Sequence, residues 1–149
     1  GRYQDSIPLY AGCLQGFMAD DLSIRMKLLK GYFLNGEYDN AIELGTSLDS
    51  EKTFRDSEER VAYAWALFFA GRGDLAEKVF SDMDRSFTNY DQRLEYCKFL
   101  LKTEKVESAK DKLKDLMDEF DQMQVLERRL KRDVLREVKD LYTNHFSAA

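Results

Sequence analysis

The sequence predicts an all-α protein built from repeated antiparallel helical hairpins. Its 149 residues are 34% charged and 44% hydrophobic, with only one Pro, which is typical of helical globular proteins. Small residues recur at intervals of 33 to 35 positions, and within each interval apolar residues follow a helical period. A chain of this length is expected to form a single domain, here residues 1–149.

A small side chain near the start of each second helix defines the repeat. These residues fall in one register along the chain: Ser6, Ala41, Ala76 and Ala109. A small residue is needed where two helices cross closely, because a larger one would force the backbones apart. Gly-containing segments at 36–41 and 71–76 mark the turns inside two of the hairpins.

The register and the helical period together predict the bounds of the elements. Residues 2–17 are expected to form the second helix of a truncated repeat, and complete hairpins follow at 21–49, 56–84 and 88–120. The longest connection, 49–57, ends in a natural helix cap at Asp56 or Ser57.

An amphipathic helix is expected at 122–145, after the last repeat. Its apolar stripe contains Val125, Leu126, Leu130, Val134, Val138, Leu141 and Tyr142. A stack of repeats ends in an exposed apolar face, so we expect this C-terminal capping helix to cover it.

This register resembles the tetratricopeptide repeat over residues 3 to about 120. In that family a large residue, a small one and an aromatic mark the first helix, and Gly, aromatic, Ala and aromatic mark the second. The chain departs from the pattern where the usual Trp is replaced by Arg25, Arg60 and Arg93, and no Pro follows a second helix. The resemblance implies a right-handed superhelix of hairpins, a TPR-like α-solenoid, that serves as a protein–protein interaction scaffold in a bacterial assembly.

The resemblance also implies a binding site, since the first helices of this family line a concave groove that holds a peptide or protein segment. Transfer by register selects Met26, Lys30, Phe33, Val61, Trp65, Phe69, Leu94, Lys98 and Leu101. Trp65 and Phe69 lie one turn apart and are the expected anchors, because aromatic residues supply large contact area at low entropy cost. The alternative for Trp65 is packing between helices.

The family's acidic chaperone-tail ligand is not expected. The positions that would grip a terminal carboxylate hold Met26, Ala62 and Asp91 among others. An extended or helical hydrophobic peptide is the expected partner.

No catalytic set, cofactor motif or metal site is expected. His145 is the only histidine, and Cys13 and Cys97 both occupy small-residue positions that favour inert core thiols. Gly71 and Gly73 lack the strand and third glycine of a phosphate-binding loop.

Two other functions stay open as alternatives. The net charge of −5 argues against nucleic acid as the main partner, but the basic residues at 128–136 leave weak nucleic-acid binding as one alternative. The other is a self-associating structural domain, a homodimer formed through the first helix at Ile7 and Tyr10.

The expected location is the cytoplasm. No apolar run reaches the ~20 residues of a membrane span, so the chain itself is not expected to insert into a membrane. A tether upstream of Gly1 is left open as an alternative.

Overall fold

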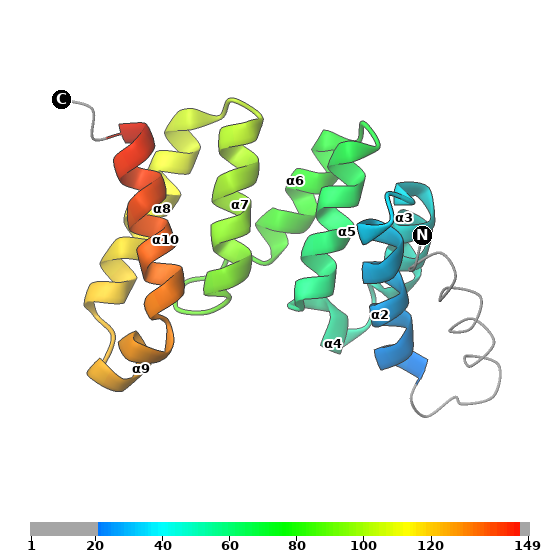
Figure 1. The fold of residues 1–149 in the computed structure, drawn as a ribbon, viewed down its shortest axis with the longest axis horizontal. Helices are drawn as coiled ribbons and strands as arrows, with labels where there is room; N and C mark the ends of the chain where they lie inside the picture. Colours follow the sequence, from blue (N-terminus) through cyan, green and yellow to red (C-terminus); the bar gives the residue numbers. More distant parts are fainter. Residues whose placement is uncertain (1–20, 147–149) are drawn as a thin grey trace. The chain divides into compact units, whose positions relative to one another are not determined.

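The computed structural model describes residues 21–146, and this part of the chain contains helices and no strand (Figure 1). The helices are α2 (Asp21–Leu34), α3 (Tyr38–Leu48), α4 (Lys52–Arg55), α5 (Glu58–Phe69), α6 (Gly73–Asp82), α7 (Tyr90–Lys102), α8 (Val106–Asp121), α9 (Val125–Leu130) and α10 (Arg132–Phe146). The all-α prediction is therefore confirmed for these residues. The helix expected at 2–17 lies outside them.

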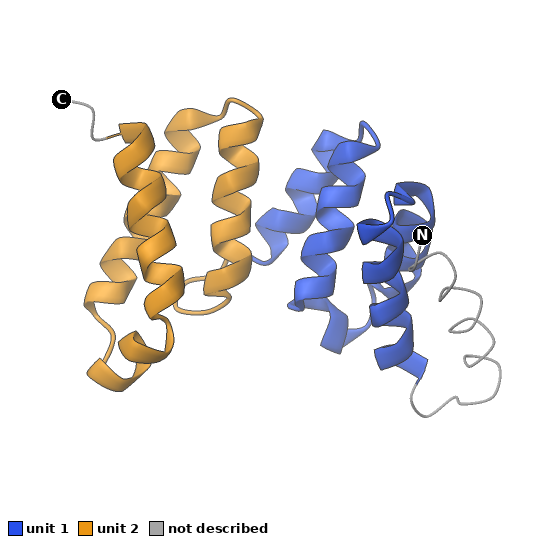
Figure 2. Cartoon of the chain, in the orientation of Figure 1, with its two compact units in different colours: residues 1–83 blue, residues 84–149 orange. Residues whose placement is uncertain are grey.

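The chain divides into two compact units, residues 1–83 and 84–149 (Figure 2). In unit 1, α2 and α3 form one hairpin, α5 and α6 form the next, and both α2 and α3 pack against α5. The largest fully buried side chains of this unit are Leu29, Leu48, Phe54, Leu67, Phe80 and Met83.

Unit 2 consists of one hairpin and the helix that covers it. The hairpin is formed by α7 and α8, and α10 packs against both. Its core contains Tyr90, Leu94, Cys97, Leu113, Leu116, Phe120 and Val138, so α10 contributes one fully buried side chain. Val138 therefore anchors α10 on the α7/α8 hairpin.

The three first helices, α2, α5 and α7, end in the same hydrogen-bonded turn. The N–H groups of Glu37, Arg72 and Lys105 donate to the carbonyls five residues earlier, over 2.9, 2.8 and 2.8 Å. The preceding residues, Gly36, Gly71 and Glu104, have φ values of 79°, 83° and 64°. This is the Schellman ending of a helix, in which the left-handed residue favours glycine.

The small-residue register is also visible in the structure. Ala41, Ala76 and Ala109 are each the fourth residue of α3, α6 and α8, and each is fully buried. The prediction that they share one position in the hairpin is confirmed for these three. Ser6 lies outside the described residues.

Four positions after the small residue, α6 has Phe80 and α8 has Leu113, but α3 has Gly45, and the structure gives the reason. A Cβ atom at Gly45 would lie 2.3 Å from Cδ1 of Tyr63, whose ring packs directly on the α3 backbone. The Tyr63 hydroxyl is 3.1 Å from Thr46 Oγ1. The aromatic ring from α5 therefore fills the space that a large α3 side chain occupies in other repeats.

Two segments differ from the expected boundaries. The connection at 49–57 contains the short helix α4, which buries Phe54. The single helix expected at 122–145 is broken at Lys131 into α9 and α10, and α9 has no buried residue. Val125, Leu126 and Leu130 are thus not part of the stripe that packs on the α7/α8 hairpin, which corrects that prediction.

Candidate functional site

Aromatic side chains from three helices of unit 1 gather where the first helices end. We call Phe33, Tyr38, Trp65 and Phe69, together with the exposed Leu34 at the end of α2, the aromatic surface. The Phe69 ring centroid lies 5.3 Å from Tyr38, 5.9 Å from Trp65 and 6.4 Å from Phe33. Such offset and tilted pairs stabilise each other by about 0.5–1.5 kcal/mol beyond the area they bury.

The aromatic surface is open to solvent at its centre. Phe69 is 46% exposed and Leu34 is 51% exposed. Trp65 is half-buried, and its ring meets the buried Phe80 edge-on at a centroid distance of 5.5 Å. The surface therefore has a fixed aromatic base and an accessible apolar top, which is a suitable arrangement for an apolar partner.

The structure divides the predicted binding residues of unit 1 into two groups. Lys30 is exposed on α2, and Phe33, Val61, Trp65 and Phe69 are at least partly exposed on α2 and α5. Met26 is only 9% exposed and belongs to the core. We therefore remove Met26 from the candidate surface, because its side chain packs inward between the helices.

The predicted residues of unit 2 are less accessible. Leu94 is 3% exposed and belongs to the α7/α8/α10 core, so it too is removed. Lys98 Nζ lies 2.9 Å from Glu95 Oε2 and 2.9 Å from Glu137 Oε1, which joins α7 to α10. Leu101 is half-buried.

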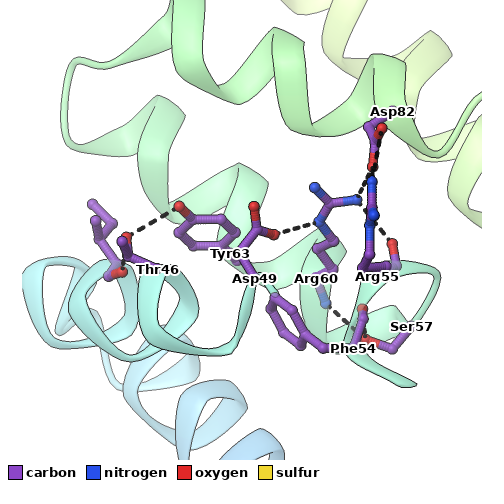
Figure 3. Close-up of polar contacts among 9 residues, drawn as sticks. Thr46, Asp49, Phe54, Arg55, Ser57, Arg60, Tyr63 and Asp82 are labelled. Atoms are coloured by element: carbon purple, nitrogen blue, oxygen red, sulfur yellow. Dashed lines mark hydrogen bonds and ion pairs between the residues drawn. The ribbon is translucent and has the colours of Figure 1, made fainter. Parts of the chain in front are cut away.

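A buried arginine organises the polar side of unit 1 (Figure 3). Arg60 is 4% exposed, and it donates to Asp82 Oδ2 at 2.6 Å, to Asp49 Oδ1 at 2.9 Å and to the Arg55 carbonyl at 2.9 Å. Hydrogen bonding to Arg60 lowers the pKa of Asp82 below its ordinary value. Because Asp49 follows α3 and Asp82 ends α6, this arginine ties α5 to both second helices of the unit.

Arg93 takes the same place in unit 2. It donates to both carboxylate oxygens of Glu119, to Asp84 and to the Thr88 carbonyl, which, like the Arg55 carbonyl, lies five residues before the arginine. Burial opposes the charge of Arg93, but the hydrogen bonds to Glu119 and Asp84 leave its pKa raised.

This role could not be seen in the sequence, where the arginines stand only as departures from the tetratricopeptide pattern. For Arg25 and Arg60 the available signal was a polar residue 22 positions later, near the end of the second helix, whereas Glu119 lies 26 positions after Arg93. Arg25 bonds Ser47 Oγ at 3.0 Å, and Arg60 bonds Asp82, both 22 residues further on. Buried guanidinium groups need such partners, because an unpaired buried charge is strongly unfavourable.

A cavity of about 380 Å³ adjoins the Arg60 centre. Arg55, Arg60 and Lys78 line it on the polar side, and Leu67, Leu75 and Val79 line it on the apolar side. Asp49 and Asp82 pair with two of its three cations, Arg55 and Arg60, so the cavity keeps little net positive charge for an anion.

The only described thiol is structural. Cys97 is fully buried, and burial raises its pKa to about 12, which keeps the unreactive thiol form at neutral pH. The core-thiol prediction is confirmed for Cys97, and Cys13 lies outside the described residues. Among residues 21–146 no group of three or more His, Cys, Asp or Glu side chains is placed to hold a metal ion.

None of the helices between Asp21 and Phe146 has both the length and the hydropathy to cross a membrane. No family model matches the chain, and no curated protein or solved structure is similar to it at a significant level.

Proposed function

We propose that this chain is a tetratricopeptide-type interaction scaffold that binds a hydrophobic peptide segment of a partner protein on the aromatic surface of α2, α3 and α5. The repeated Schellman turns and the buried alanines support the repeat architecture. In this proposal the hairpins belong to a right-handed superhelix whose first helices form the binding side. The chain has no catalytic role and acts in the cytoplasm.

The observation that carries the proposal is the exposure of Phe69 at the centre of a stacked aromatic cluster. A phenylalanine that is 46% exposed gives up much of the free energy of burial, which a partner's apolar side chain would recover. The neighbouring rings fix its orientation, so little side-chain entropy is lost on binding. Aromatic residues with such support are the usual hot spots of interfaces.

Charge around the aromatic surface refines the ligand class. Lys27 and Lys30 are exposed on α2, and Lys30 lies one helical turn before Phe33 and Leu34. Acidic residues flanking the apolar part of the peptide would therefore speed its association. The proposed ligand is an extended or helical peptide with aliphatic or aromatic side chains and an acidic flank.

Selection from a displayed library of short peptides tests this function. We expect the wild-type chain to enrich apolar sequences, and a synthetic peptide made from them to change the emission of Trp65, the only tryptophan. Phe69→Ala should weaken the affinity for this peptide about ten-fold. Phe87→Ala is the matched control, because Phe87 is 55% exposed and lies in unit 2. Equal affinity of both variants would contradict the proposal.

A further inference from the structure

The helix α9 presents an apolar face that no described part of the chain covers. Val125 is 69% exposed, Leu126 is 70% exposed and Leu130 is 76% exposed, which makes them more exposed than any other large hydrophobic residue of the described chain. At 100° per residue these three side chains and Arg129 share one side of the helix.

The opposite side of α9 is anchored. Arg128 donates from Nη2 to the carbonyls of Phe120 at 2.9 Å and Asp121 at 3.0 Å, where α8 ends. These bonds cap the free carbonyls of α8 and fix the rotation of α9 about its own axis. The outward direction of the apolar face is thus held by the fold rather than left to a free loop.

Basic residues are concentrated in α9 and directly after it. The segment 125–136 contains five basic residues and two acidic ones, in a chain whose net charge is −5. Within residues 21–146 no ion pair involves Arg129, Lys131, Arg132 or Arg136. The basic charge is therefore local and available to an anionic surface.

We propose that α9 docks the chain onto an anionic membrane surface, with Val125, Leu126 and Leu130 entering the headgroup region and the basic residues bound to lipid phosphates. Short amphipathic helices bind in this way when apolar and basic side chains share an exposed edge. The structure favours this partner over two others. Single-stranded nucleic acid is bound by stacking on aromatic residues, and α9 has none. A protein interface takes about 800 Å² from each partner, well above what three aliphatic side chains expose.

Flotation with lipid vesicles tests the proposal on the full chain. Vesicles of phosphatidylcholine are compared with vesicles that also contain about 30 mol% phosphatidylserine, an anionic lipid. We expect binding to the anionic vesicles only, and its loss at high salt, because surface attraction is screened. The absence of binding to anionic vesicles would overturn the proposal.

Two pairs of variants separate the apolar and basic contributions. Each double variant should reduce partitioning onto the anionic vesicles about ten-fold or more. The apolar variant combines Leu126→Ser with Leu130→Ser, and the basic variant combines Arg129→Gln with Arg132→Gln. The controls are Val106→Ser, at an exposed apolar residue of the same unit, and Lys114→Gln with Lys139→Gln, at exposed lysines. Circular dichroism verifies that each variant is folded. Equal losses in the controls would overturn the proposal, as would a dimer or an RNA complex that requires Leu126 and Leu130.

Discussion

Arg93 and Glu119 form a paired, buried ion contact in which two guanidinium nitrogens meet two carboxylate oxygens at 2.7 and 2.6 Å. The Phe87 N–H also donates to Glu119, at 2.6 Å. This one carboxylate therefore joins α8 to the start of α7 and to the loop before it. The helix that carries Leu94, Lys98 and Leu101 takes its position from this contact.

Removing this carboxylate should strongly destabilise the chain. Glu119→Ala removes two of the hydrogen bonds of the buried Arg93 guanidinium and the acceptor of the Phe87 N–H, so we expect the free energy of unfolding to fall by about 3 kcal/mol. Chemical denaturation followed by circular dichroism measures the change. Asp118→Ala, at an exposed neighbour, should change it by less than about 0.5 kcal/mol. A loss in Glu119→Ala no larger than in Asp118→Ala would show that the contact is not structural.

The same carboxylate should make stability depend on acid pH. Burial alone would raise the pKa of Glu119, but the hydrogen bonds from Arg93 and Phe87 lower it below the ordinary value of 4.5. A depressed folded-state pKa contributes stability that is complete above that ordinary value and is lost as the pH falls through the folded pKa. We expect the free energy of unfolding to decline below about pH 4.5, with a shallower decline in Glu119→Gln. If the free energy of unfolding depends on pH in the same way in the wild-type chain and in Glu119→Gln, Glu119 is not the titrating group.

The Schellman turns predict that two substitutions change the free energy of unfolding in opposite directions. Glu104 has a φ of 64°, a region that glycine adopts without strain, so Glu104→Gly should raise the free energy of unfolding by about 0.5–1 kcal/mol. Gly71 has the same conformation with open space around it, and Gly71→Ala should lower the free energy by about 1 kcal/mol. Thermal unfolding of both variants checks the pair, and a destabilised Glu104→Gly would refute the equivalence of the turns.

Gly45 should tolerate no side chain. The 2.3 Å approach to the Tyr63 ring predicts that Gly45→Ala costs about 1–3 kcal/mol of stability. Gly73→Ala, where an added Cβ meets nothing within 4 Å, is the control with no such loss. In a Tyr63→Ala background the effect of Gly45→Ala should shrink, because the two residues share one contact. If Gly45→Ala costs as much stability in the Tyr63→Ala background as in the wild-type chain, the loss arises from the α3 backbone and not from the Tyr63 contact.

The hairpins could be predicted from the sequence because their signals are local. Ala41, Ala76 and Ala109 repeat in register, and Gly36 and Gly71 mark turns that demand a left-handed residue. Glu104 takes the same conformation without a glycine, so the third turn could be found only from the register.

The partners of the buried arginines could not be predicted, since Arg60 meets Asp49 and Asp82 only after three helices have packed. The same holds for burial within a helix face. The register predicts that Met26 and Phe33 share one surface, but the structure buries Met26 and leaves Phe33 partly exposed. The prediction of one apolar stripe over 122–145 is wrong for a related reason. The helix breaks at Lys131, and Val125, Leu126 and Leu130 face outward.

Amide chemical-shift mapping with a library-selected apolar peptide tests the binding role of α2 and α5 most directly. We expect the shifts to concentrate at residues 30–38 and 61–69, around Phe33 and Phe69, and to disappear in Phe69→Ala. Shifts confined to other helices, with α2 and α5 unchanged, would contradict it.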